Sequence, residues 1–147
     1  LESVIISIHA ATENTYNKLV EHGDFKAVMK NIEYLSELKK QKEKFQTLQL
    51  NFVVNSLNYK EMKTFIKLAK KLGATAFFIN YHRQIDSDEL MNKLDISQQT
   101  HPKYNDLVKY LQDDIFNEEC CILSDYFKGL RPVKRTLKEN FLNLFKK

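Results

Sequence analysis

The sequence predicts an α/β fold: three parallel strands with crossover helices, forming part of a TIM-like barrel, followed by a C-terminal helical extension. Short strand-like runs alternate with helical segments. Each connection is long enough for a right-handed crossover between parallel strands. Polar residues gather at the carboxyl ends of the strands, where barrel enzymes build their sites. We expect the half-barrel in residues 1–85 and the helical extension in residues 86–147.

The three strand-like runs are residues 3–9, 47–55 and 75–82. The first connection contains a long helix that Asp24 can cap. In the second connection, Asn58 is placed to cap a helix, and Glu61 three residues later completes a capping-box pattern. Gly73 then ends that helix, because glycine is favoured immediately after a helix C-terminus.

After residue 85 the pattern predicts helices. A short helix is expected over residues 86–94 and a longer one from Pro102 to about Phe116, since proline is tolerated in a first helical turn. The adjacent Cys120 and Cys121 are expected in the core of a further helical segment. An amphipathic helix over residues 136–147 closes the predicted extension.

Composition limits the class of protein. The chain has 147 residues, 43% of them hydrophobic, which is enough to bury the core of one compact domain. Its net charge of +4 comes mainly from lysine, without the interleaved arginines and aromatics of a nucleic-acid surface. No apolar run reaches the roughly 20 residues of a membrane span.

The cysteines, the histidines and the first residues of the chain predict the cellular compartment, the absence of a metal site and a fragment of a longer protein. Two adjacent cysteines form no disulfide framework, which favours a reducing, cytoplasmic setting. The four histidines (His9, His22, His82 and His101) match no zinc-binding spacing, so no metal site is expected. The chain begins at Leu1, without methionine, and enters a strand by Ser3, so we expect a fragment of a longer protein.

Side chains alternate across a strand, so each run divides into two faces. One face is almost wholly apolar and is expected to carry the helices. The other is expected to line a barrel lumen, with Ile5, Val53 and Phe78 on it and polar residues toward the carboxyl ends: Ser7, His9, Asn51, Asn55, Asn80 and His82. The alternative is an antiparallel, half-exposed sheet whose second face meets water.

Several segments resemble the C-terminal half of the radical S-adenosylmethionine (SAM) barrel. ISIHAATENTY and HGDFKAVMKNIEYL are similar to its fourth strand and the following helices. LNFVVNSLNYKEMKTFIKLAKKLGA is similar to the fifth strand and helix, and TAFFINYH to the sixth strand. The resemblance covers residues 3–82 and implies a partial (β/α)6 barrel.

This resemblance implies that the full-length protein is a radical SAM enzyme with SAM and a 4Fe–4S cluster as cofactors. Such an enzyme cleaves SAM to a 5′-deoxyadenosyl radical that abstracts hydrogen from a small-molecule or peptide substrate. The Cys-x3-Cys-x2-Cys motif that holds the cluster is absent here, so the fragment alone is expected to keep no cofactor and to be inactive. The resemblance assigns contacts with SAM to five positions: Ser7, His9, Asn51, Asn55 and Asn80. It assigns His82 to the substrate side of the site. It identifies no catalytic residue.

One position departs from the family pattern. Val20 stands where many relatives have an arginine that pairs with the SAM carboxylate. A non-catalytic binding module derived from such a barrel therefore stays open as an alternative. An ordinary TIM-barrel lyase is a second alternative, but it would more typically place a lysine or a carboxylate at a strand end.

The first strand also predicts self-association. Its preceding partner would be missing from the fragment, leaving unpaired backbone groups along an apolar edge that only Glu2 protects with charge. We expect association of two copies through this edge or through the open face of the sheet.

Overall fold

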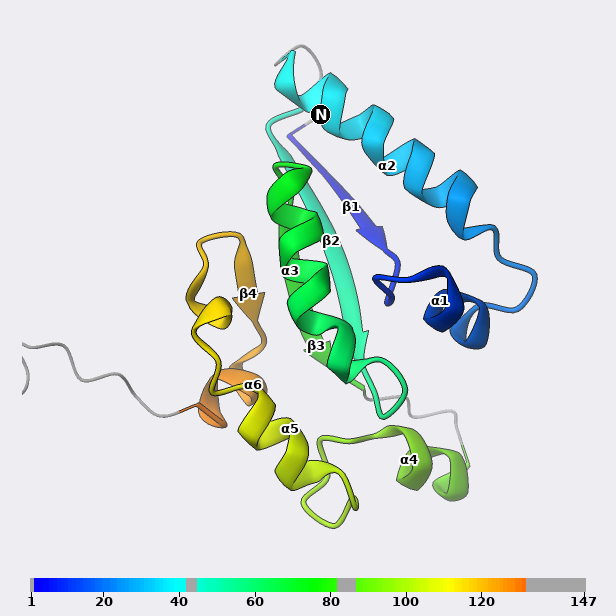
Figure 1. Ribbon diagram of the computed structural model, residues 1–147, viewed down its shortest axis with the longest axis vertical. Coiled ribbons are helices and arrows are strands. Elements are labelled where there is room, and N and C mark those ends of the chain that lie inside the picture. The colour runs from blue at the N-terminus through cyan, green and yellow to red at the C-terminus, as the bar shows by residue number, and fades with distance from the viewer. Residues whose placement is uncertain (1, 42–44, 82–86, 132–147) are drawn as a thin grey trace, which may run out of the picture.

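The computed structural model describes residues 2–41, 45–81 and 87–131 and contains one four-stranded sheet (Figure 1). All strand pairs are parallel, and the strands lie side by side in chain order. They are β1 (Ser3–Ser7), β2 (Thr47–Val54), β3 (Thr75–Asn80) and β4 (Cys121–Leu123). The parallel pairing confirms the α/β prediction and excludes the antiparallel alternative. The sheet is open, and no closed barrel is present in the described residues.

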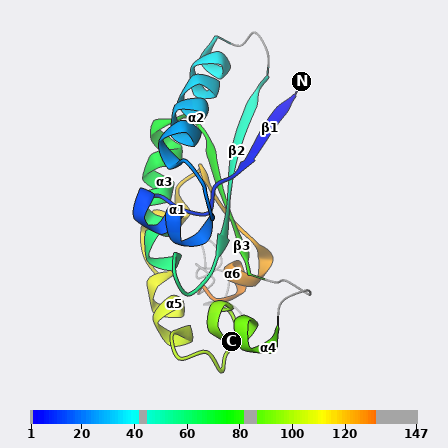
Figure 2. The ribbon, with the colours of Figure 1, turned by 90° about the vertical axis from the view of Figure 1, so that its right-hand side faces the viewer.

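Helices connect the strands and cap the sheet. The first crossover contains α1 (Glu13–Leu19) and α2 (Phe25–Lys40); the second contains the 3-10 turn η1 (Tyr59–Glu61) and α3 (Met62–Lys71). Between β3 and β4 lie α4 (Asp88–Leu94), α5 (Tyr104–Tyr110) and the 3-10 turn η2 (Asp114–Asn117), and α6 (Asp125–Gly129) follows β4. In Figure 2, α1, α2, α3 and α5 lie on one side of the sheet.

Local signals explain where the main helices begin and end. The side chain of Asp24 accepts a hydrogen bond from the Ala27 N–H and caps α2 as predicted, at 3.0 Å. Gly73 follows α3 with φ of 61°, a left-handed conformation that glycine adopts without steric cost. The helix expected over residues 102–116 is interrupted, because α5 ends at Tyr110 and η2 begins at Asp114.

The fourth strand corrects the prediction of an all-helical extension. Cys121 pairs with Ala76 of β3, so this cysteine belongs to a sheet strand and not to a helix core. A three-residue strand is too short for period-two alternation to reveal it in the sequence. The helix predicted over residues 136–147 lies outside the described residues.

Helices α1 to α3 bury one face of the sheet against a continuous core. Phe52 of β2 contacts Phe65 of α3 edge-on, with ring centroids 4.8 Å apart. Phe78 of β3 joins them, 5.4 Å from Phe52. Offset and edge-on arrangements are the favourable ones for aromatic pairs, and all three side chains are fully buried.

The register of β3 contradicts the predicted face of Phe78. Phe52 and Phe78 are paired across β2 and β3, so they share the helix-covered face, and Phe78 is 0% exposed. Phe77 pairs with Asn51 and lies on the opposite face. Because side chains alternate, this one-residue difference also moves Asn80 to the helix-covered face.

The other face of the sheet is left without a covering layer in the described residues (Figure 2). Ile5 is 59% exposed and Ile122 is 41% exposed, whereas Val53, Phe77 and Ile79 on the same face are half-buried. A parallel sheet normally has both faces covered. This open face, defined by these residues together with Ser7 and Asn51, is the unusual feature of the fold.

Candidate functional site

The candidate site lies where the carboxyl ends of the strands meet the open face. Because the strands are parallel, their carboxyl ends meet at one edge of the sheet, and α4, α5 and α6 lie near this edge (Figure 1). Ligand sites of open α/β sheets and of barrels form at this edge. Of the six predicted site residues, the structure describes all except His82.

Ser7 and Asn51 are brought together as predicted. They are register partners on neighbouring strands and lie on the open face near its carboxyl end. Ser7 is exposed and Asn51 is half-buried. The Gln49 side-chain amide donates to Asn51 Oδ1 at 2.8 Å, which orients the Asn51 amide group. The pair therefore offers one hydroxyl and one amide, both uncharged.

His9 follows β1 in an unusual conformation. Its φ is 58°, in the left-handed region that few non-glycine residues adopt, although histidine is among the enriched types. The turn lets its imidazole reach β2, where Nδ1 accepts the Val53 N–H at 3.0 Å. The ring thus replaces a backbone carbonyl in the ladder between β1 and β2.

This contact defines the protonation state of His9. Because Nδ1 accepts a hydrogen bond, it carries no proton, and the neutral ring holds its proton on Nε2. Burial lowers the pKa of His9 below its usual value, which further favours the neutral ring. His9 therefore provides a neutral N–H donor at the end of β1.

Asn58 organises the strand ends, a role that the sequence does not predict. Its Nδ2 donates to the carbonyls of His9 and Val53, each at 2.9 Å, and its Oδ1 accepts the Asn55 N–H at 2.8 Å. Asn58 is 0% exposed and makes no side-chain cap to the following helix. The asparagine that matched a capping pattern instead joins the ends of β1 and β2.

The predicted site residue Asn55 has a structural partner. It is buried, and its Oδ1 accepts the Leu57 N–H at 2.9 Å. Such a contact is an Asx turn, which reverses the chain after β2. The carboxamide oxygen of Asn55 thus shapes the loop that presents Asn58.

Asn80 ends β3 on the helix-covered face, opposite Ser7 and Asn51. It is the register partner of the buried Val54 and is itself half-buried. The structure therefore does not bring Asn80 together with Ser7 on one face. His82, the predicted substrate-side residue, lies outside the described residues.

Glu61 also departs from the capping-box prediction. Its carboxylate accepts hydrogen bonds from the Ala11 N–H at 2.7 Å and from the hydroxyls of Thr12 and Thr15, at 2.5 and 2.6 Å. Thr12 is the N-cap of α1. Glu61 therefore holds the loop between β1 and α1 against the start of α3.

Residues that follow β3 in the chain pack against the loop after β2, at the carboxyl edge of the sheet. The Ser56 N–H donates to the Leu94 carbonyl at 3.0 Å, and the Lys103 ammonium donates to the Ser56 carbonyl at 3.1 Å. Tyr126 of α6 donates its hydroxyl to the Ser97 carbonyl, and burial raises the pKa of Tyr126 to about 12. The phenol is therefore neutral at physiological pH and joins α6 to the segment after α4 as a hydrogen-bond donor.

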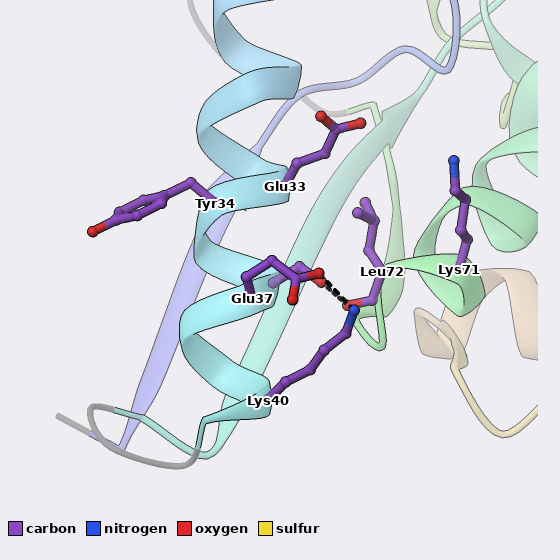
Figure 3. Close-up of a pocket in the computed structure, with 7 residues that line it drawn as sticks. Glu33, Tyr34, Glu37, Lys40, Lys71 and Leu72 are labelled. Carbon is purple, nitrogen blue, oxygen red and sulfur yellow. Dashed lines mark hydrogen bonds and ion pairs between the residues drawn. The ribbon is translucent and has the colours of Figure 1, made fainter.

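A hollow of about 370 Å³ between α2 and α3 lies away from the candidate site (Figure 3). It lies at the carboxyl ends of these helices, beside the amino ends of the strands. Glu37 and Lys40 form an ion pair across part of it at 2.6 Å, and the Ser36 hydroxyl donates to the Leu72 carbonyl at 2.7 Å. Several of its polar groups are therefore already engaged within the protein.

Metal-ligating groups are scattered in the described part of the chain. Within residues 2–41, 45–81 and 87–131, no three His, Cys, Asp or Glu side chains are grouped closely enough to hold a metal ion. Cys120 and Cys121 are free thiols, and burial raises the pKa of Cys121 to about 12. A thiol with so high a pKa is a poor metal ligand and a poor nucleophile.

Comparisons with known proteins find no relative. No protein-family model matches the chain, and neither the curated proteins nor the solved structures include a significant match. Among the described residues, no helix has both the length and the apolar character needed to cross a membrane.

Proposed function

We propose that this chain is the C-terminal part of a radical SAM enzyme and that the open face lines the cavity for SAM and substrate. Strand order is the observation that carries the proposal. The four parallel strands lie in sequential order, and the helices α1, α2, α3 and α5 of their connections lie on one face of the sheet (Figure 2). A barrel has this arrangement, whereas a doubly wound sheet reverses its order and carries helices on both faces.

The open face has the chemistry to contact an adenosyl group. Ser7 can donate to or accept from a ribose hydroxyl, and the Asn51 amide can do the same at an adenine edge. His9, two residues after Ser7, adds a neutral N–H donor. None of the three groups therefore carries a charge at neutral pH. Half-buried Phe77 shares a register row with Ser7 and Asn51 and adds an apolar surface.

The iron–sulfur cluster does not fit the residues of this chain. Three thiolates are needed beside SAM, and the sequence contains two cysteines, which are adjacent. A bound cluster would supply the electron that cleaves SAM, so that chemistry belongs to another part of the proposed full-length protein. This chain would contribute hydrogen bonds and the shape of the cavity.

SAM binding by the full-length protein tests the proposal. Ser7→Ala and Asn51→Ala should each weaken SAM binding by roughly 0.5–1.5 kcal/mol, the usual net value of one hydrogen bond. Ser3→Ala is the matched control, because Ser3 shares the face with Ser7 but lies at the amino end of β1. Calorimetric titration gives the affinities; unchanged affinity in both site variants would exclude the open face as the SAM site.

Val20 favours a second candidate, a non-catalytic binding module. It ends α1 and packs against the core, and its side chain offers no charge to a SAM carboxylate at the position where many radical SAM enzymes have arginine. Reconstitution of the full-length protein with iron and sulfide under anaerobic conditions separates the two candidates. Stoichiometric iron with cleavage of SAM supports the enzyme, whereas ligand binding without iron supports the module.

A further inference from the structure

A second hollow, of about 380 Å³, lies outside the candidate site, between η1, the first turn of α3, and α5. Figure 1 shows α5 beside the lower end of α3. The residues that line this hollow are mainly basic and aromatic: Tyr59, Lys60, Lys63, Asp106, Lys109 and Tyr110. A volume of this size is in the usual range for small-molecule sites.

Tyr110 fixes the two walls of this hollow relative to each other. Its hydroxyl donates to the Lys60 carbonyl at 2.6 Å, across fifty positions of sequence. Its ring lies edge-on to Tyr59, with centroids 6.0 Å apart. Burial raises the pKa of Tyr110, so the phenol stays neutral and adds no negative charge to the hollow.

The charges of the lining favour an anion. Lys63 is paired with Asp113, at 2.5 Å, and its ammonium lies 4.5 Å from the centre of the Tyr110 ring. Lys60 lies over the Tyr59 ring at 5.8 Å. Neither Lys60 nor Lys109 forms an ion pair within the described residues, so two ammonium groups are available to a ligand.

Asp106 narrows the class of ligand further. A carboxylate is a hydrogen-bond acceptor only, so it would repel a bare polyanion but would accept hydrogen bonds from hydroxyl groups. The tyrosine rings add apolar surface against which a sugar or base can pack. Lysine ammonium groups bind phosphate as point charges.

We propose that this hollow, here called the lysine–tyrosine pocket, binds a small hydroxylated organic phosphate, such as a sugar phosphate or a nucleoside monophosphate. Lys60 and Lys109 contact the phosphate, and Asp106 accepts from a hydroxyl of the ligand. The ion pair with Asp113 and the Tyr110 ring hold Lys63 at the wall. This site is separate from the open face and does not depend on the function proposed for it.

Ribose 5-phosphate is the probe for the test, with ribose as the uncharged comparison. Amide NMR spectra of the chain should show saturable shifts at Lys60, Lys63 and Tyr110 with ribose 5-phosphate and none with ribose. Lys60→Ala combined with Lys109→Ala should weaken binding about tenfold or more, because two charge-assisted contacts are lost. Asp106→Asn should weaken ribose 5-phosphate binding, because a hydrogen bond from the ligand hydroxyl is lost. It should also strengthen binding of inorganic phosphate, because a repelling negative charge is removed. The ratio of the two affinities should therefore fall more than the affinity for ribose 5-phosphate.

The control is Lys30→Ala combined with Lys71→Ala, which removes the same charge from exposed positions outside the pocket. This variant should bind ribose 5-phosphate like the parent chain at the same ionic strength. Equal weakening in both double variants would show attraction to overall positive charge and overturn the proposal. Equal shifts with ribose, or no shifts at millimolar ribose 5-phosphate, would overturn it as well.

Discussion

Asn58 is the residue on which the carboxyl edge depends most directly. It satisfies the carbonyls of His9 and Val53 and the N–H of Asn55, all in a fully buried position. Buried polar groups that lose their partners cost about 1–3 kcal/mol each. The hydrogen bonds of one side chain therefore determine how β1 and β2 end.

We expect Asn58→Ala to lower the free energy of unfolding by about 3 kcal/mol or more, since three buried backbone groups lose their partner at about 1–3 kcal/mol each. Asn58→Asp keeps an oxygen for the Asn55 N–H but turns an acceptor toward the His9 and Val53 carbonyls, so it should destabilise the fold at least as much as Asn58→Ala. Urea denaturation measures both variants. A loss below about 0.5 kcal/mol in Asn58→Ala would show that water replaces the amide.

His9 should make stability depend on pH. Burial lowers its pKa in the folded state, so below the unfolded value near 6.5 the unfolded chain binds more protons than the folded chain. Stability is then greatest above this pH and falls as the pH drops through 6.5 toward the folded pKa. Denaturation between pH 7.5 and 5 should show this fall, and His9→Gln should make it shallower. An identical pH dependence in the variant would contradict the effect.

At the scale of elements, Glu61 joins the start of α3 to the start of α1. Three donors from the β1–α1 loop and from α1 converge on one carboxylate. The contact spans about fifty positions in sequence, so it couples the first crossover to the second. The ion pair of Lys63 with Asp113 similarly couples α3 to the segment before β4.

Glu61→Ala should destabilise α1 more than the rest of the fold. The Ala11 N–H and the hydroxyls of Thr12 and Thr15 lose their acceptor, at a cost of about 1–3 kcal/mol. Hydrogen exchange should quicken in α1 while β2 stays protected. Glu61→Gln, which keeps one acceptor oxygen, should show an intermediate effect. Uniform loss of protection over all elements would argue against a local role for Glu61.

At the scale of the whole molecule, the open face and the free edge of β1 favour association of two copies. Within the described residues β1 pairs only with β2, so its other side presents unpaired backbone groups. Ile5 lies on this strand and is 59% exposed. Charge on an edge strand opposes edge-to-edge pairing.

Light scattering over a range of concentrations should therefore reveal self-association of the chain. Ile5→Lys should shift the distribution toward monomer, because it places a charge on the edge strand and removes apolar surface. Tyr34→Lys is the matched control, since Tyr34 is 63% exposed on α2, away from the open face. Similar shifts in both variants would show that net charge, not the sheet, controls association.

The sequence by itself determined the strands β1 to β3, the helices between them and their parallel order. These depend on local periodicity and on caps such as Asp24, which act within one strand or helix, and on the lengths of the connections between the strands. The juxtaposition of Ser7 and Asn51 was also predictable, because parallel strands align their carboxyl ends. Their function as SAM contacts stays a prediction.

Only the tertiary structure decided the register of β3, the existence of β4 and the partners of Asn58 and Glu61. Adjacent Phe77 and Phe78 are equally apolar, so alternation cannot tell which faces the helices; pairing with Phe52 decides it. β4 is three residues long and exists through its contacts with β3. Asn58 and Glu61 matched a local capping pattern, but both reach residues about fifty positions away, and such long-range contacts leave no local signal in the sequence.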